Sequence, residues 1–487
     1  MQRAATKTPD RRRPELTLLD GLRVVPPGVA RRHKVIPLRY EGDRLVVGAV
    51  DPENLAALDA LHRLGHALIE FEPLSQERYR EVMQKWYGPV GDIAEFAARL
   101  PPRLDPGEPS LDFDERSDEA PAARFLALTL TAALSENASD VHVEPDRISP
   151  RVRFRVDGVL VDRVAPPPWL ADRIIGRVKS MAGLALGECL FAQDGQLSFP
   201  TPAGSVSIRV SIVPSDRGEC AVLRLLTVDN EVPTLEQLGM PAAIRLPLVE
   251  AAAGQEGLIV FAGPTGCGKT TSLYALLETV DADRRNIVSI EEPVEIHSRR
   301  VRQVPVRRET GLDFASALRF VLRQDPDIIL VGETRDTETA ELVLQASLAG
   351  HLVLTTVHAS NALGVFDRFE QLGADRRLLA QVMRLAVSQR LIRLICPNCA
   401  GKACFACDGT GLKGRTGVFE LITLGNELAE LVRQGAGPSQ LRAAARHAGM
   451  RTLQEAAAEL ERRGATTAAE IERVLDLQGH SGSPGGV

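Results

Sequence analysis

One short motif constrains the fold of this chain more than any other feature. It follows the apolar run Leu258–Ala262, precedes a helix-compatible stretch that begins at Thr271, and reads Gly263-Pro264-Thr265-Gly266-Cys267-Gly268-Lys269-Thr270. A Gly-x-x-x-x-Gly-Lys-Thr pattern between a strand and a helix indicates a phosphate-binding loop. A glycine-rich turn that matches by accident is the alternative, and the correct flanks disfavour it. We therefore expect a buried strand, an anion-binding turn and a helix in that order.

The chemistry of this loop predicts ATP and Mg²⁺ as cofactors. Glycines let backbone N–H groups turn inward around phosphates, and the helix N-terminus adds a positive dipole. Lys269 is expected to reach the β- and γ-phosphates, and Thr270 is expected to ligate Mg²⁺. The expected nucleotide-contacting residues are Gly263, Pro264, Thr265, Gly266, Cys267, Gly268, Lys269, Thr270 and Thr271.

Two strands that end in acids supply the candidate catalytic carboxylates. Ile328–Val331 leads into Glu333, which we expect to act on Mg²⁺ through water, although glutamate replaces the usual aspartate. Ser289-Ile290 leads into Glu291 and Glu292, of which Glu291 is the first candidate to polarise the attacking water and Glu292 the second. Solvated acids at strand ends are the alternative. Ligand sites of parallel α/β sheets lie at the carboxyl ends of strands, which favours the functional interpretation.

His358 closes another apolar strand, Leu352–Val357. A lone histidine is usually structural, but this strand should end near the same crevice. His358 is therefore a candidate γ-phosphate sensor.

Four of the seven cysteines are clustered: Cys396, Cys399, Cys404 and Cys407. Two Cys-x-x-Cys pairs suit tetrahedral Zn²⁺ with no open position, which is typical of a structural site. Redox or disulfide use is the alternative, and it is disfavoured in a chain without an export signal.

Composition excludes several classes of function. The net charge is −6 over 487 residues, so no global basic field points to nucleic acid as a partner. No apolar run is long enough to span a bilayer, and the start lacks an apolar signal core. We therefore expect a cytoplasmic protein with no direct membrane span.

The chain divides into several expected parts. Residues 231–395 alternate strands with helices, which favours a parallel sheet with crossover helices. In Arg151–Val156 apolar and basic residues alternate, so one strand face is buried and the other presents three arginines. The full prediction is a disordered leader at 1–15, a partner-docking α/β domain at 16–95, an acidic proline-rich linker at 96–121, a second domain at 122–235, a motor domain at 236–395 and 412–478, a tetracysteine module at 396–411 and a disordered tail at 479–487.

Together these segments resemble the ATPases of type II secretion and type IV pilus assembly. The likeness covers about Leu16 to Leu475. It is carried by Gly263–Thr271, Glu291–Glu295, Leu322–Asp336, Thr337–Ala340, Gly350–His358, Ala138–Pro145, Arg153–Val159, Gln193–Gly195, Arg209–Ser211 and Lys413–Glu420. Two features depart from the family pattern. The acidic box reads Glu291-Glu292-Pro293 instead of Glu-Asp-Pro, and only Ala400–Ala403 separate the cysteine pairs, where the family has a longer insert.

The resemblance implies a multidomain α/β protein with a RecA-like P-loop motor domain. A PAS-like α+β domain and a small N-terminal α/β domain would precede it. It implies a homo-hexamer, peripheral at the inner membrane, whose turnover is passed to an inner-membrane platform protein. The N-terminal domain would dock on a bitopic inner-membrane protein. In this family second-domain arginines contact the phosphates, and the candidates here are Arg155, Arg209 and Arg224, for each of which a solvated strand face is the alternative.

The resemblance leaves the machine to be chosen. A single short N-terminal unit followed by a linker favours the type II secretion form, in which ATP hydrolysis drives pseudopilus assembly and export of folded proteins across the outer membrane. A type IV pilus extension ATPase is the first alternative, and a nucleotide-binding scaffold without turnover is the second. A DNA-translocating ATPase shares the P-loop, but the acidic balance and the cysteine module argue against it.

Overall fold

The computed structural model describes residues 24–475, apart from 26, 42, 87, 101–119, 147–149, 202–203, 227–231, 308–309, 403 and 405–406. The predicted leader, tail and most of the predicted acidic linker lie outside the described residues. The chain separates into two compact units, one of residues 1–227 with 396–413 and one of residues 228–395 with 414–487. Across the described ranges, no helix combines the length and apolar character that crossing a membrane requires.

The first sheet of the first unit is small and mixed. Its strands run in the order β1-β2-β3, with β1 antiparallel and β3 parallel to β2. Helix α3 begins at Leu55 and is capped by Asn54, whose side chain accepts from the Ala57 N–H at 3.1 Å. The elements are α2 (Pro27–His33), β1 (Val35–Glu41), β2 (Arg44–Ala49), α3 (Leu55–Arg63), β3 (Leu68–Pro73), α4 (Gln76–Trp86) and α5 (Pro89–Arg99).

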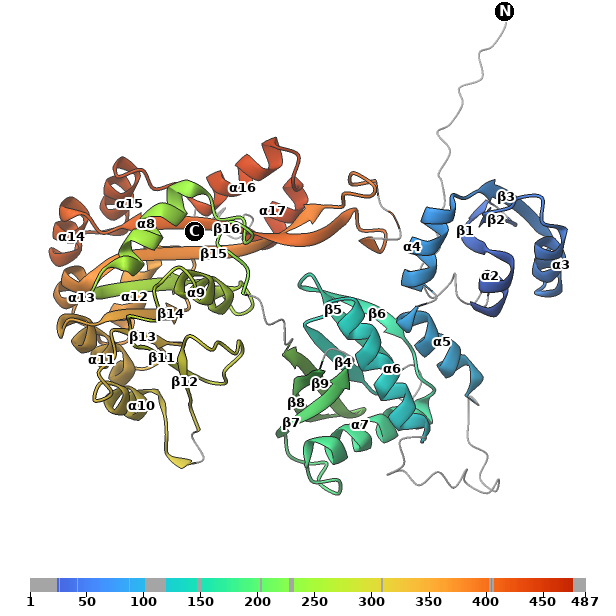
Figure 1. Ribbon diagram of the computed structural model, residues 1–487, viewed down its shortest axis with the longest axis horizontal. Helices are drawn as coiled ribbons and strands as arrows, with labels where there is room; N and C mark the ends of the chain where they lie inside the picture. The colour runs from blue at the N-terminus through green and yellow to red at the C-terminus, as the bar shows by residue number, and fades with distance from the viewer. Residues whose placement is uncertain are drawn as a thin grey trace, which may run out of the picture. The chain divides into compact units, whose positions relative to one another are not determined.

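The second sheet of this unit is antiparallel, with strand order β6-β5-β4-β9-β8-β7 (Figure 1). Alternation in β5 has the predicted effect, because Val152 and Phe154 are fully buried while the arginines lie on the other face. The buried face packs on residues of α6 and α7. The elements are α6 (Pro121–Ser135), β4 (Asp140–Glu144), β5 (Arg151–Val156), β6 (Val159–Val164), α7 (Pro168–Ala182), β7 (Gln193–Thr201), β8 (Gly204–Ser215) and β9 (Gly218–Leu226).

The second unit is built on a seven-stranded sheet in the order β12-β11-β13-β14-β10-β15-β16. The pairings from β12 through β15 are all parallel, which confirms the predicted parallel sheet. The strands are β10 (Gly257–Ala262), β11 (Ile287–Glu291), β12 (Arg302–Pro305), β13 (Ile328–Val331), β14 (Leu352–Val357), β15 (Met383–Ile395) and β16 (Leu412–Thr423).

Helices cover both faces of this sheet, and strand β10 shows why. Leu258 and Val260 join an apolar core with α10 to α13, whereas Ile259 and Phe261 join another core with α8 and α9. A strand buried on both faces reads as a continuous apolar run, as this one does. The helices are α8 (Ala242–Ala253), α9 (Lys269–Leu277), α10 (Phe314–Val321), α11 (Thr337–Leu348), α12 (Gly364–Gln371) and α13 (Arg376–Val382).

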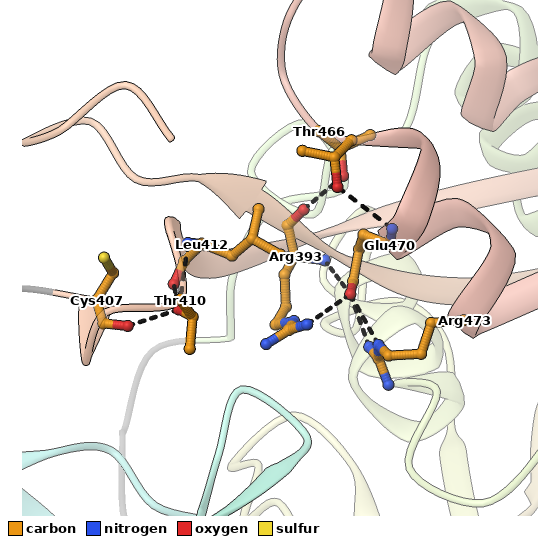
Figure 2. Close-up of polar contacts among 8 residues, drawn as sticks. Arg393, Cys407, Thr410, Leu412, Thr466, Glu470 and Arg473 are labelled. Atoms are coloured by element: carbon orange, nitrogen blue, oxygen red, sulfur yellow. Dashed lines mark hydrogen bonds and ion pairs between the residues drawn. The ribbon is translucent and has the colours of Figure 1, made fainter. Parts of the chain in front are cut away.

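The C-terminal helices of the second unit are fastened to strand β15 by a buried carboxylate. Glu470 is fully buried, and Figure 2 shows the guanidinium groups of Arg393 and Arg473 directed at it, at 2.7 and 2.6 Å. Thr466 adds a hydrogen bond from its hydroxyl to the Arg393 carbonyl at 2.8 Å. The helices are α14 (Asn426–Arg433), α15 (Pro438–His447), α16 (Leu453–Arg462) and α17 (Ala468–Leu475).

Candidate functional site

The predicted phosphate loop has the backbone that its glycines allow. It joins β10 to α9, with Gly263, Gly266 and Gly268 at φ of 149°, 75° and 88°. A Cβ on Gly263 would lie 2.6 Å from the Cys267 sulfur and 2.8 Å from the Gln389 carbonyl oxygen. Only glycine fits there, because such separations are too short for a real carbon. Residues 264–266 are exposed, so the tip of the loop is open to a ligand.

Lys269 opens helix α9 and folds back over the loop. Its Nζ donates to the carbonyls of Gly263 at 2.8 Å and Pro264 at 2.9 Å. Burial lowers the pKa of this ammonium, and nearby acids oppose that effect. Thr270 and Thr271 lie in the first helical turn, half-buried. The loop thus presents a cation and a helix N-terminus to one place, which suits a phosphate group.

Glu333 lies just beyond strand β13 and is held between a histidine and an arginine. Its two carboxylate oxygens lie 2.9 Å from His358 Nε2 and 2.7 Å from Arg335 Nη2. Burial raises the pKa of Glu333, but the Arg335 hydrogen bond and neighbouring positive charges outweigh it and leave the pKa below its usual value. Glu333 is therefore ionised at neutral pH.

His358 connects this acid to the phosphate loop. Its Nδ1 lies 3.2 Å from the Gly263 carbonyl oxygen, while Nε2 lies beside Glu333. The structure thus brings together three features that the sequence predicts separately: the P-loop, the acid after β13 and the histidine after β14.

The two acids at the end of β11 have different surroundings. Glu291 is buried, and its Oε1 accepts hydrogen bonds from the hydroxyls of Tyr274 at 2.5 Å and Ser289 at 2.6 Å. Burial raises the pKa of Glu291, and these hydrogen bonds oppose it. Glu292 is more exposed, and its carboxylate lies 3.6 Å from the guanidinium of Arg335, which also binds Glu333.

The three candidate arginines share one row of the six-stranded sheet. Arg155 is opposite Asp140, Asp140 is opposite Arg224, and Arg224 is opposite Arg209. Asp140 is buried, and its oxygens lie 3.5 Å from Arg155 Nε and 2.9 Å from Arg224 Nε. This row carries more positive than negative charge. It belongs to the first compact unit, whereas the P-loop belongs to the second.

The four clustered cysteines bring their sulfurs to one point, all within 4.8 Å of one another. The Cys396–Cys404 and Cys399–Cys407 sulfurs are 3.8 Å apart, and the Cys404–Cys407 sulfurs 3.7 Å. Sulfurs about 2.3 Å from a tetrahedral zinc would be about 3.8 Å apart, whereas a disulfide needs about 2.05 Å. All seven cysteines are free. The cluster is therefore able to hold a metal ion, and the short linker does not prevent it.

The comparisons with known proteins agree with this geometry. Residues 115–473 match the family model described as type II/IV secretion system protein. The chain belongs to this secretion ATPase family. Residues 8–91 match the MshEN domain, and an intact P-loop makes this family member an ATP hydrolase.

Individual relatives include proteins of both kinds of machine. The type II secretion system protein HxcR of Pseudomonas aeruginosa is 38% identical, over 85% of this chain and 91% of its own length. The type IV pilus assembly ATPase PilB of Myxococcus xanthus is 34% identical, over 93% of this chain and 86% of its own length. The Legionella pneumophila ATPase DotB shares the fold, with a TM-score of 0.57 and 22% identity over 72% of this chain and 95% of DotB.

The structure also adds residues that the sequence did not single out. Arg335 joins Glu292 to Glu333, and the charge of exposed Glu295 partly opposes the burial that lowers the pKa of Lys269. Glu295 could have been found, because it closes the same acidic segment two residues after Pro293. Tyr274 had no such signal, since its contact with the acids is made only by folding.

Proposed function

We propose that this chain is the ATPase motor of a type II protein secretion system and drives pseudopilus assembly for export of folded proteins across the outer membrane. Its similarity to HxcR over most of both chains supports this assignment. The observation that carries the motor function is the contact of His358 with both the P-loop carbonyl and Glu333, which links the loop to the acid. A type IV pilus extension ATPase is the second candidate, favoured by the similarity to PilB.

In this proposal the P-loop residues hold the nucleotide, and different residues bind its phosphates and the Mg²⁺ ion. The backbone N–H groups of Gly263–Thr271 and the ammonium of Lys269 bind the phosphates, and Thr270 ligates Mg²⁺. The metal ion, when bound, neutralises charge on the β- and γ-phosphates. Lys269 exchanges its two loop carbonyls for phosphate oxygens, which are better acceptors because they are charged.

The acids and the histidine are assigned by their surroundings. Glu333 is ionised and would orient water at the Mg²⁺ ion, and His358 would sense the γ-phosphate through its contact with Gly263. Between the acids of β11 we favour Glu292 as the group that activates water. Glu291 accepts hydrogen bonds from the buried hydroxyls of Tyr274 and Ser289 and from the Gln303 amide, so Glu291 holds the strand end instead.

The remaining parts of the proposal rest on the family and on local chemistry. Arg155, Arg209 and Arg224 supply guanidinium groups to the phosphates, because their row has surplus positive charge. Cys396, Cys399, Cys404 and Cys407 hold a structural Zn²⁺, which has no role in catalysis.

We further propose a homo-hexamer in the cytoplasm, peripheral at the inner membrane. Its N-terminal domain docks on a bitopic inner-membrane protein and its motion reaches a membrane platform protein. Nucleic acid has no part in this function. The docking domain is residues 16–95, the second domain 122–235, the motor domain 236–395 with 412–478, and the tetracysteine module 396–411.

The assignment is tested in cells with Lys269→Ala. Exported enzymes and surface pili are both measured, beside Arg284→Ala, which removes an exposed cation of the same unit. Lost secretion with normal pili supports the type II assignment. Lost pili with normal secretion moves it to pilus extension, and no change in either at normal protein abundance contradicts the motor function.

A further inference from the structure

Strand β15 runs beside β10 and continues past its end, next to the phosphate loop. Ala262, the last residue of β10, is paired with Ser388. Gln389 and Arg390 therefore lie alongside the loop that follows Ala262. These two residues come from a part of the chain that is more than a hundred residues away in sequence.

Gln389 binds the loop backbone directly. Its side chain is 2% exposed, and its Nε2 donates to the Cys267 carbonyl at 2.6 Å. The fit is close, because a Cβ on Gly268 would lie 2.9 Å from Nε2 and one on Gly263 would lie 2.8 Å from the Gln389 carbonyl oxygen. Gln389 therefore touches the loop near both of its ends.

The amide oxygen of the same side chain, by contrast, is left unpaired among the residues that the structure describes. Within the described residues, Gln389 Oε1 is buried and receives no hydrogen bond. Leaving a buried amide oxygen unpaired is destabilising. A group needed only for packing would be apolar at such a place, so the retained amide points to a use for its N–H at the loop.

Arg390 fastens the same strand end to the loop that carries His358. Its guanidinium donates to the carbonyls of Gln389 at 2.9 Å and Ser360 at 2.7 Å. In the part of the chain that the structure describes, Arg390 has no carboxylate within ion-pair distance. It therefore spans two backbone carbonyls, one beside the P-loop and one two residues after His358.

We propose that Gln389 is a positioning residue that keeps the phosphate loop in its nucleotide-binding shape, and that Arg390 holds the His358 loop in register with it. The inference rests on the assignment of the P-loop to ATP. Gln389 acts on binding, because it sets where the loop N–H groups point. Arg390 acts on turnover, because it sets where His358 lies relative to Glu333.

The test uses purified full-length protein and ATP, with affinity measured by calorimetry and turnover by phosphate release. Gln389→Met keeps the size of the side chain but cannot donate, so we expect Kd and KM to rise about tenfold, with kcat at saturating ATP within about twofold of wild type. Arg390→Lys keeps the charge but not the double contact, and we expect a lower kcat at unchanged Kd. The matched control is Gln371→Met, the same substitution at an exposed residue at the end of α12.

If Gln389 had a purely structural role, Gln389→Met would lower the melting temperature and leave the Kd for ATP unchanged. That result overturns the inference. If Gln389→Met does not fold, Gln389→Asn carries the same comparison, since its amide falls short of Cys267 by one methylene. If the wild-type protein binds no ATP, the P-loop assignment itself is overturned. If the wild type and Gln389→Met bind ATP equally well, only the inference about Gln389 is overturned.

Discussion

The buried carboxylate of Glu470 gives a sharp expectation about the C-terminal helices. Burial raises the pKa of Glu470, but hydrogen bonds from Arg473 and Arg393 outweigh that effect and bring the pKa from 4.5 to about 2. A difference of about 2.5 units corresponds to about 3 kcal/mol of differential stabilisation of the ionised form. In Glu470→Gln this contribution is lost, because the neutral amide offers the two arginines one acceptor oxygen instead of two charged ones.

The pH range follows from the direction of the shift. Because the folded pKa is depressed, the stabilisation is fully present above pH 4.5 and is lost as the pH falls through about 2. Hydrogen exchange of the α17 amides reports local opening of this helix. At pH 7 we expect about a hundredfold faster exchange in Glu470→Gln, with the difference from wild type shrinking below about pH 4.5.

The matched control for this experiment is Glu472→Gln, an exposed acid on the same helix. It should exchange as the wild type does. Equal protection of α17 in the two variants would refute the reasoning, because it would mean that Glu470 contributes nothing through Arg393 and Arg473.

Three further predictions concern the proposed site. Glu292→Gln should lower kcat about a hundredfold at unchanged melting temperature. Glu291→Gln should chiefly lower the melting temperature. Turnover assays and thermal unfolding of both variants distinguish the two roles. Arg209→Gln should lower kcat at least about tenfold at unchanged stability, whereas a solvated arginine would leave turnover as it is. Purified protein should contain one zinc per chain by elemental analysis, and Cys404→Ser should lose it while ATP binding persists; a full zinc content in that variant would contradict the four-cysteine site.

The sequence predicted what depends on local spacing. The P-loop needs glycines at fixed positions between a strand and a helix, so its residues could be named in advance. Glu333 and His358 follow apolar strands, and the carboxyl ends of parallel strands meet at one edge, so their proximity to the loop was also predictable.

Contacts between distant segments could not be predicted in this way. Alternation in β5 indicated which face carries Arg155, but the row with Asp140 and Arg224 depends on strand register. Gln389 reaches Cys267 only because β15 pairs with β10, and no motif announces that pairing. The difference between Glu291 and Glu292 likewise appears only when Tyr274 is packed against the strand end.

The central claim is that turnover of ATP, and not its binding alone, drives export. Glu333→Gln tests it most directly, because the variant keeps the P-loop and its affinity for ATP while losing the ionised carboxylate between Arg335 and His358. Secretion in cells and ATP binding and hydrolysis by the purified variant are measured together. The account predicts normal ATP binding, turnover lowered about a hundredfold and no secretion. Normal secretion by a variant that binds ATP without hydrolysing it would contradict the account and identify a nucleotide-binding scaffold instead.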